Sequence, residues 1–208
     1  MFKTEAFKLG WFEVQDASSQ LVAAYLDVQP GMKVIDTCAG AGGKTLHLAS
    51  LMENKGQLIA MDIYESKLRK LKVRAKRNSV HNITLKTIDS TKPIKKLHDK
   101  ADRVLIDAPC SGLGVLRRNP DSKWKLQPEF LDNIRATQQE ILCSYSKMVK
   151  PGGKLVYATC SVLPSENQDQ VKQFLATNKD FKFVSDEKIL SSQSGYDGFY
   201  MALLERNK

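Results

Sequence analysis

The sequence predicts an α/β fold with a mainly parallel, doubly wound sheet of seven strands. Short runs of Val, Ile and Leu alternate along the chain with longer segments of helical periodicity. Near-continuous apolar runs of this kind are typical of strands that are buried on both faces of a sheet. The regular alternation of strands and helices indicates parallel strands joined by crossover helices.

Each expected element has a local signal in the sequence. The runs that predict strands are 33–38, 57–62, 83–89, 103–110, 154–161, 182–185 and 198–207. The segments that predict helices are 43–53, 65–78, 128–150 and 165–178. Gly152 and Gly153, which follow Pro151, are expected to end the helix over 128–150 and lead into the next strand. Residues 1–30 are expected to form a lead-in of strand and helix within a single domain over 1–208.

Composition and charge narrow the class of protein. Of the 208 residues, 42% are hydrophobic and 26% charged, as in ordinary globular domains. Apolar runs are too short to span a bilayer and the N-terminal segment lacks a signal-peptide core, so we expect a cytoplasmic protein with no membrane partner. A formal net charge of +9 favours a nucleic acid partner, although surplus lysine also serves solubility.

The four cysteines do not form a metal-binding or disulfide pattern. They are Cys38, Cys110, Cys143 and Cys160, with no C-x-x-C pair among them and only three scattered histidines. We therefore expect no metal site and no disulfide framework. The default interpretation of each cysteine is a small buried apolar residue, unless its position in the fold says otherwise.

Acidic residues and cysteines gather at the ends of the expected strands. These residues are Asp36, Cys38, Asp62, Asp89, Asp107, Cys110 and Cys160. A single aspartate in such a place has a simple explanation as a helix cap or turn former, and Asp89 before "STKP" fits that explanation. Four strands that end in aspartate, two of which also carry a cysteine, are more than capping requires. Because the carboxyl ends of parallel strands open on one edge of the sheet, we expect the active site there.

The stretch "DTCAGAGGKTLHL", residues 36–48, resembles a phosphate-binding loop but fails both common fingerprints. A Walker-type loop requires a glycine where this chain has Cys38. A dinucleotide fingerprint that starts at Gly40 requires its third glycine where this chain has Thr45. The loop therefore predicts a ligand without a pyrophosphate.

S-adenosylmethionine fits this loop and the acidic strand ends. Asp62 lies 22 residues after Gly40, about the offset at which an acidic residue holds a ribose diol in such folds. Asp89 is placed to meet the adenine amino group. The positive sulfonium and amino groups of this cofactor also suit an edge lined by aspartates.

Five motifs extend a family resemblance over nearly the whole chain. They are "GWFEVQDASSQLVAAYL", "DTCAGAGGKT", "DAPCSGLGVLRRNPDSKW", "YATCSVLPSENQDQV" and "GYDGFYMALL". With them the chain resembles the RNA cytosine-C5 methyltransferases of the Sun/Fmu type. The resemblance implies a Rossmann-like class I methyltransferase fold with one antiparallel strand. The family usually carries "CAAPGGK" in the first loop, where Gly40 and Ala41 here replace Ala-Pro.

The resemblance also implies which residues bind S-adenosylmethionine. They are Cys38, Ala39, Gly40, Ala41, Gly42, Gly43, Lys44, Asp62, Asp89 and Asp107.

Cytosine C5 methylation requires a nucleophile that adds to C6, and cysteine suits this role because its thiolate attacks well and leaves again. The sequence offers Asp107 and Cys110 in "DAPCS" and Cys160 in "ATCS". On position alone, either cysteine is a candidate nucleophile. The resemblance assigns attack to Cys160, release of the product to Cys110, and contact with cytosine N3 to Asp107. Cys143 is expected to pack in the core, and Cys38 to pack beneath the cofactor loop.

The segment "LRRNPDSKWK" is the strongest candidate for RNA contact. Arg117, Arg118 and Lys123 are expected to meet phosphates, and Trp124 to stack on a base. The alternative for Trp124 is a core residue that pins the loop. The seven basic residues between 67 and 77 form one face of an amphipathic helix, which is either a phosphate contact or a solvated face.

The segment "GVLRRNPDSKW" is most similar to family members that act on small-subunit ribosomal RNA. Several other functions remain open. They are cytosine-C5 methylation of tRNA or DNA, methylation of an exocyclic amine, because "DAPC" is faintly similar to "DPPY", and a non-catalytic RNA-binding scaffold. Both cysteines, the four aspartates and Lys44 favour an enzyme. We expect a monomer without a separate RNA-binding domain, either a minimal enzyme or an excised catalytic domain.

Overall fold

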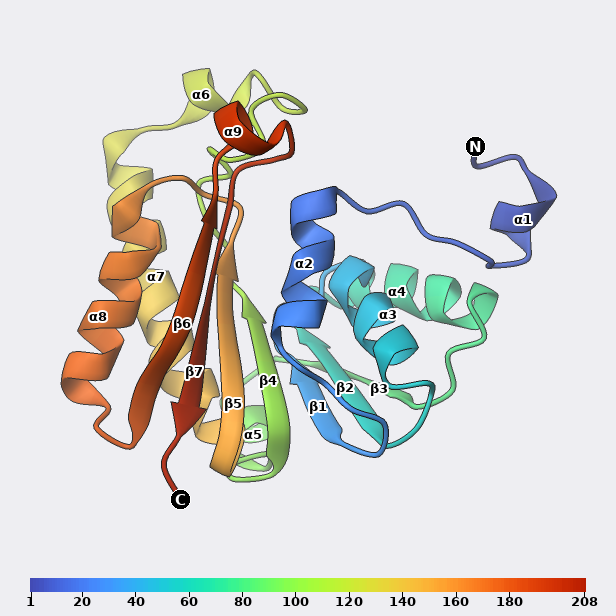
Figure 1. Cartoon of the computed structure of the whole chain (residues 1–208), viewed down its shortest axis with the longest axis horizontal. Helices are drawn as coiled ribbons and strands as arrows, with labels where there is room; N and C mark the ends of the chain where they lie inside the picture. The colour runs from blue at the N-terminus through green and yellow to red at the C-terminus, as the bar shows by residue number, and fades with distance from the viewer.

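The computed structural model describes residues 1–208, apart from the side chain of Lys125. Seven strands form one sheet in the order β3-β2-β1-β4-β5-β7-β6 (Figure 1). The strands are β1 (Lys33–Asp36), β2 (Gln57–Asp62), β3 (Ile83–Thr87), β4 (Ala101–Asp107), β5 (Val149–Thr159), β6 (Phe181–Ile189) and β7 (Phe199–Arg206). β7 pairs antiparallel with β5 and β6, and the pairs among β1 to β5 are parallel. The predicted mainly parallel sheet with one antiparallel strand is confirmed.

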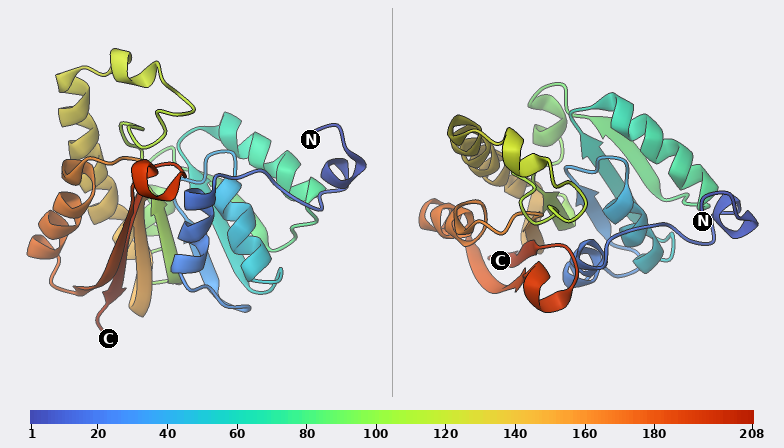
Figure 2. Two further views of the ribbon diagram at one scale, coloured as in Figure 1. Left: turned by 45° about the horizontal axis from the view of Figure 1, so that its top comes forward. Right: turned by 90° about the horizontal axis from the view of Figure 1, so that it is seen from above.

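Helices cover both faces of this sheet (Figure 2). The α-helices are α1 (Glu5–Lys8), α2 (Ala17–Tyr25), α3 (Gly43–Leu51), α4 (Glu65–Arg77), α5 (Lys92–Lys95), α6 (Ser122–Lys125), α7 (Pro128–Tyr145), α8 (Gln168–Thr177) and α9 (Ser191–Ser194), and the 3-10 helices are η1 (Ser146–Met148) and η2 (Pro164–Glu166). α5, α7 and α8 pack on one face, and α2, α3 and α4 on the other. None of the helices in the described chain is long and apolar enough to cross a membrane.

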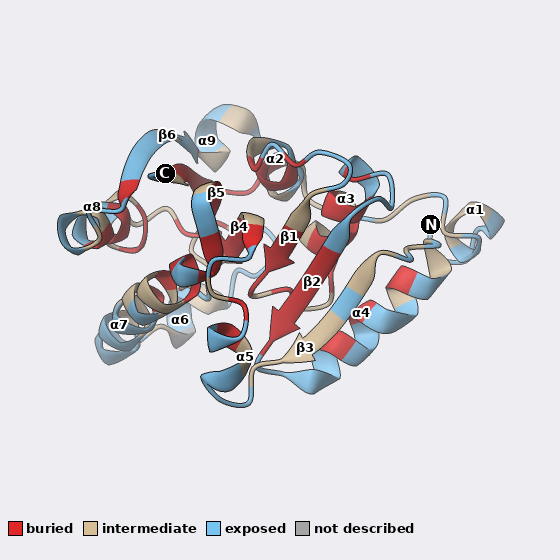
Figure 3. Ribbon diagram, turned by 90° about the horizontal axis from the view of Figure 1, so that it is seen from below, coloured by how far each residue is buried: buried red, intermediate tan, exposed pale blue. Residues whose placement is uncertain are grey.

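The central strands are buried on both faces, as their apolar sequences predict (Figure 3). In β1, Val34 faces the layer of α2 and α3, whereas Ile35 faces the layer of α5, α7 and α8. β5 alternates in the same way, with Tyr157 and Val156 on opposite faces. This two-sided core holds the strands rigidly, so the loops at their carboxyl ends start from well-defined positions.

The structure differs from the sequence prediction around β5. The helix expected over 128–150 ends at Tyr145, and β5 begins at Val149, before the Pro-Gly-Gly turn. The reason is a bulge in the pairing with β4, where Ala101 lies opposite Val149 but Arg103 lies opposite Lys154. The turn residues 150–153 are therefore accommodated inside the strand instead of preceding it.

Several strands end earlier than predicted. β1 ends at Asp36, β3 at Thr87 and β4 at Asp107, so the loops at the carboxyl edge are longer than the sequence indicates. The lead-in over 1–30 contains α1 and α2, but the described backbone has no strand there. Asp16 caps α2, because its side chain accepts hydrogen bonds from the N–H groups of Ser18 and Ser19.

Candidate active site

The loops that follow β4 and β5 bring Cys110 and Cys160 together. β4 and β5 are neighbouring parallel strands, and Asp107 lies opposite Ala158 at their ends. The chain leaves both strands at the same edge, beneath α6 and α9 at the top of Figure 1. There the two Sγ atoms lie 3.3 Å apart. The Gly114 N–H donates to the Cys160 carbonyl at 2.9 Å, which holds the backbones of the two loops together.

The two thiols differ in acidity. The hydrogen bond from the Cys110 thiol and the nearby Lys44 ammonium lower the pKa of Cys160, although burial and Asp107 oppose this. The same pairing with Cys160, together with burial, raises the pKa of Cys110 well above its ordinary value. Cys160 is therefore the thiol that ionises first, with Cys110 as its hydrogen-bond donor.

Lys44 connects the glycine loop with Asp107. It lies in the first turn of α3, and its Nζ is 2.7 Å from Oδ2 of Asp107. Burial favours neutral lysine, but the Asp107 carboxylate outweighs it and raises the pKa of Lys44. The Nζ also lies 5.0 Å from the centre of the Phe199 ring. A fixed positive charge therefore stands beside Asp107 and the cysteine pair.

The glycine loop is held by Asp62 and leaves its own backbone accessible. The Gly40 N–H donates to Oδ2 of Asp62 and the Tyr64 N–H to Oδ1, each at 2.8 Å. Gly40 has φ +56°, and a Cβ there would meet nothing within 4 Å. Gly42 has φ +92°, and a Cβ there would collide with Leu71. These glycines allow a turn whose outer side at Gly40 is open to a ligand.

Three other residues at or just after the strand ends, Asp36, Cys38 and Asp89, differ in burial and in hydrogen bonding. Asp36 is buried and accepts from the Thr45 hydroxyl at 2.7 Å, while burial raises its pKa to about 7. Its Oδ1 has no hydrogen-bond partner in the described chain. Cys38 packs against the core, where burial raises its pKa. Asp89 lies two residues beyond β3, is exposed, and accepts from the Ser90 hydroxyl at 3.1 Å.

Comparison with known proteins identifies the family. A family model described as 16S rRNA methyltransferase RsmB/F matches residues 23–205. The chain belongs to this family. The matched residues include the glycine loop, Asp107 and both cysteines of the pair.

Individual relatives agree with this assignment. The probable ribosomal RNA small subunit methyltransferase B of Synechocystis sp. is 39% identical over 217 residues, covering 96% of this chain and 49% of that protein. The ribosomal RNA small subunit methyltransferase B of Vibrio cholerae is 38% identical over 209 residues, covering 96% and 47%. The crystal structure of NSun6 from Pyrococcus horikoshii with SFG matches with a TM-score of 0.90 and 30% identity, covering 100% of this chain and 56% of that one. The chain thus spans about half the length of the curated relatives it matches.

In this member of the RsmB/F family, two of the predicted RNA contacts bind the protein itself. Arg118 forms an ion pair with the buried carboxylate of Asp197, and Arg117 donates to the Gly195 carbonyl. Both arginines therefore tie their loop to the segment before β7. Arg118 is still 60% exposed on its side chain, so the contact to Asp197 does not remove it from the surface.

Trp124 and the basic helix are more accessible. Trp124 is 77% exposed, which rules out the alternative that it is a core residue, and Lys123 Nζ lies 4.7 Å from its ring centre. In α4, Leu68, Leu71 and Ala75 are buried as predicted. Two of the helix's seven basic residues, Arg74 and Arg77, bind Glu13 of the N-terminal segment. The other five are exposed.

Sequence reasoning missed one residue beneath the cysteine pair. Glu166 in η2 is completely buried, and its carboxyl group accepts hydrogen bonds from Ser111 and Ser161. These serines directly follow Cys110 and Cys160. The repeated letters "CSGL" and "CSVL", with a glutamate five residues after the second serine, were the available signal.

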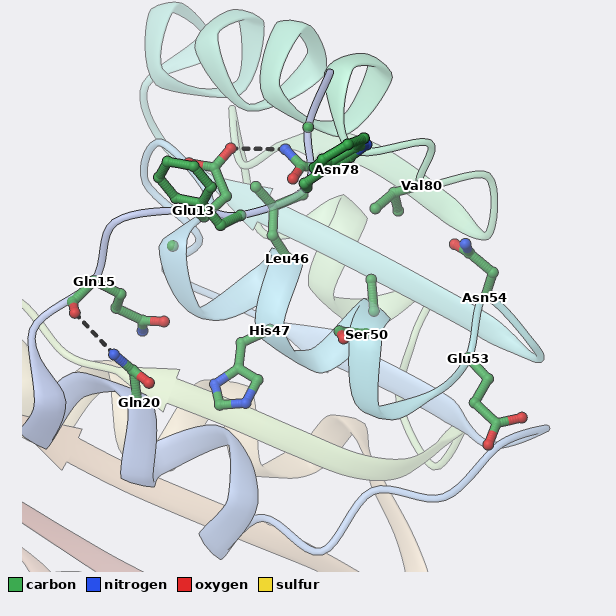
Figure 4. A pocket seen from close by; sticks show the side chains of 15 residues that line it. Glu13, Gln15, Gln20, Leu46, His47, Ser50, Glu53, Asn54, Asn78 and Val80 are labelled. Atoms are coloured by element: carbon green, nitrogen blue, oxygen red, sulfur yellow. Dashed lines mark hydrogen bonds between the residues drawn. The ribbon is translucent and has the colours of Figure 1, made fainter. Parts of the chain in front are cut away.

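A separate cavity of about 440 Å³ lies between the N-terminal segment and α3 (Figure 4). His47 points into it from α3, and its buried Nδ1 has no partner in the described chain. Gln20 donates to the Gln15 carbonyl at its rim, at 2.9 Å. Gly43 of the predicted cofactor loop lines this cavity, whereas Cys110 and Cys160 do not.

Proposed function

We propose that this chain methylates C5 of a cytosine in ribosomal RNA, with S-adenosylmethionine as the methyl donor. The observation that carries the proposal is the pair of sulfur atoms 3.3 Å apart, of which Cys160 is the more acidic. Methylation of an exocyclic amine needs no thiol, because the amine nitrogen itself attacks the methyl group. Addition of a thiolate to C6 needs a thiol of this kind. Membership of the RsmB/F family supports RNA as the substrate.

The glycine loop and its neighbours fit S-adenosylmethionine. The open side of Gly40 lets a ligand approach the backbone, and Asp62 is oriented by two backbone N–H groups. We assign cofactor binding to the predicted set, which comprises residues 38–44, Asp62, Asp89 and Asp107. When bound, the cofactor supplies an electrophilic methyl group. The aspartates at this edge favour its positive charge.

The chain's own residues account for activation of the base. The Cys160 thiolate forms a bond to C6, and the electron pair of the C5–C6 double bond becomes available at C5. Asp107 is assigned to N3, where the proton that the Cys160 thiol gives up is shared between the carboxylate and the ring and offsets the developing charge. Lys44, 2.7 Å from Asp107, holds that carboxyl group in place.

Release of the product reverses the addition. A base removes the C5 proton, the C5–C6 double bond forms again, and the bond from Cys160 to C6 breaks with the electron pair returning to sulfur. Cys110 is the assigned release residue, because its sulfur lies beside that of Cys160 and its thiol donates a hydrogen bond to the departing thiolate.

We further propose which RNA the chain acts on and which residues contact it. Small-subunit ribosomal RNA is the proposed substrate, supported by the names of the relatives. We assign phosphate contact to Arg117, Arg118 and Lys123, and base stacking to Trp124, whose ring is exposed. A cytoplasmic site of action and a monomeric state complete the proposal.

The test is a single-turnover assay with methyl-labelled S-adenosylmethionine. Small-subunit ribosomal RNA, tRNA and duplex DNA are the three substrates, and nucleoside analysis identifies the product. We expect 5-methylcytosine in the ribosomal RNA alone. An N4-methylated cytosine or an N6-methylated adenine would contradict the reaction, and label in tRNA or DNA alone would contradict the substrate.

A further inference from the structure

Two turns of matching sequence face each other beneath the cysteine pair. They are "CSGL", residues 110–113, and "CSVL", residues 160–163. In each turn the leucine N–H donates to the serine hydroxyl oxygen, at 3.4 Å for Leu113 and 3.2 Å for Leu163. The oxygens of Ser111 and Ser161 lie 3.2 Å apart, so each cysteine is followed directly by a residue at the contact between the turns.

Glu166 joins these turns from below. Its Oε2 accepts from the hydroxyl groups of both Ser111 and Ser161, and its Oε1 accepts from the Ser111 N–H at 2.8 Å. Gln138 of α7 donates to Oε1 at 3.1 Å and to the Pro109 carbonyl at 2.9 Å. The backbone carbonyl of Glu166 accepts from the Tyr157 hydroxyl at 2.8 Å, which fixes the residue to β5.

The hydrogen bonds around the Glu166 side chain require a group that accepts hydrogen bonds and donates none. Four donors converge on the two carboxyl oxygens, and an ionised carboxylate has acceptor sites for all of them. A glutamine of the same shape would place an NH₂ group against these donors at one of the two oxygen positions. The donors there would lose their partner, which is costly in a site that excludes water.

We propose that Glu166 is the positioning residue that sets the distance between the sulfur atoms of Cys110 and Cys160. It does so through the serine that follows each cysteine, without touching the substrate. This inference rests on the proposed function, in which Cys160 forms the covalent bond and Cys110 assists release. The carboxylate makes the two turns one rigid unit, so both sulfurs meet the same side of the pyrimidine ring.

The test measures the sulfur pair directly with phenylarsine oxide, which binds tightly when two thiols bridge its arsenic atom. The bridged adduct forms two As–S bonds, and the arsenic-bound oxygen leaves as water with the two thiol protons. In the wild-type chain we expect an adduct on Cys110 and Cys160, identified by mass spectrometry. In Glu166→Gln its affinity should fall by about 100-fold, because the second sulfur no longer acts at high effective concentration.

Methyl transfer is the second readout. We expect kcat to fall by about 100-fold in Glu166→Gln, because small displacements of reacting groups cost rate steeply. Binding of S-adenosylmethionine should be unchanged, because Asp62 and Lys44 lie outside the Glu166 network. If Glu166 had only a structural role, Glu166→Gln would lower the melting temperature. The folded variant would then bind the arsenical as the wild type does, and its kcat would not fall independently of its affinity for the cofactor.

Tyr200→Phe is the matched control. Tyr200 is buried in β7, and its hydroxyl donates to the Asp186 carboxylate at 2.9 Å, so this variant also removes a hydrogen bond to a carboxylate. It should bind the arsenical and turn over as the wild type does. Ser161→Ala is a second test variant, which releases one turn while Ser111 stays bound, and should weaken the bridged adduct less than Glu166→Gln does.

The outcomes separate the two proposals. Wild-type arsenical affinity in both Glu166→Gln and Ser161→Ala would overturn the positioning role, whatever reaction the protein catalyses. Lack of 5-methylcytosine with the wild-type chain would overturn the proposed function, while the arsenical comparison would still decide whether Glu166 sets the sulfur distance. Loss of the bridged adduct in Glu166→Gln together with unchanged turnover would also overturn the inference.

Discussion

The Sγ atoms of Cys110 and Cys160 lie 3.3 Å apart, although 50 positions separate these residues in the sequence. The two cysteines follow adjacent parallel strands, so the sheet brings them to the same edge. The geometry allows either sulfur to donate this hydrogen bond, but the nearby Lys44 ammonium favours the thiolate at Cys160, which leaves Cys110 as the donor. The pKa of Cys160 is lowered and that of Cys110 raised.

The two cysteines should behave differently in an adduct-trapping experiment. With S-adenosylmethionine and RNA, Cys110→Ala should accumulate a covalent protein–RNA adduct, because addition proceeds and release fails. Cys160→Ala should form no adduct, because the attacking sulfur is missing. Denaturing gel electrophoresis of labelled RNA measures both. The reverse pattern would exchange the roles of the two residues.

The reactivity of Cys160 should depend on pH in a way that Cys110 controls. Because the pKa of Cys160 is lowered, its thiolate should be populated at lower pH than an ordinary cysteine thiolate, and its alkylation by iodoacetamide should reach its midpoint below about pH 8.5. Cys110→Ala removes the donor and should shift that midpoint upward. Mass spectrometry that resolves each cysteine gives the profile. A midpoint that stays in place or moves downward in Cys110→Ala would contradict the hydrogen bond as the cause.

Arg118→Ala should lower stability because it leaves a buried carboxylate unpaired. Asp197 is 6% exposed on its side chain, and Arg118 donates to it from Nε at 2.7 Å. We expect a loss of about 1–3 kcal/mol in the free energy of unfolding, towards the lower end because Arg118 is itself largely exposed. Chemical denaturation measures this loss.

Asp197→Asn and Lys123→Ala are the controls for Arg118. Asp197→Asn in the Arg118→Ala background should recover part of the stability, since no unpaired charge then remains buried. Lys123→Ala, at an exposed position, should unfold like the wild type. Additive effects of the Arg118 and Asp197 changes would show that the ion pair is not coupled.

Gly114→Ala should disturb the loop that carries Cys160. A Cβ at this position would lie 2.0 Å from the Gly198 carbonyl oxygen and 2.7 Å from that of Cys160, both of which are backbone atoms. The loops must separate to admit it, which should cost about 1–3 kcal/mol of stability. Turnover should fall while cofactor binding persists. Calorimetry and single-turnover kinetics test this, and wild-type values in both would show that the loops yield without consequence.

Local sequence patterns were sufficient for much of the fold. The apolar runs placed all seven strands, and they were most continuous in the central strands, which are buried on both faces, whereas the edge strand β6 is mostly exposed. The helical period correctly predicted that Leu68, Leu71 and Ala75 of α4 face inward. The bulge in β5 was not predictable in the same way, because the pairing with β4, and not the Pro-Gly-Gly turn, decides where that strand begins.

For the candidate site, the sequence by itself determined the edge at which it lies, because parallel strands deliver their carboxyl ends to one side of a sheet. It supplied the cysteines, Asp107 and the glycine loop there. Only the tertiary structure decided that the two sulfurs touch, that Arg118 is paired with Asp197, and that Glu166 lies beneath both cysteine turns. These relationships join residues from different loops, and their distances depend on how separate strands pack, which local periodicity does not encode.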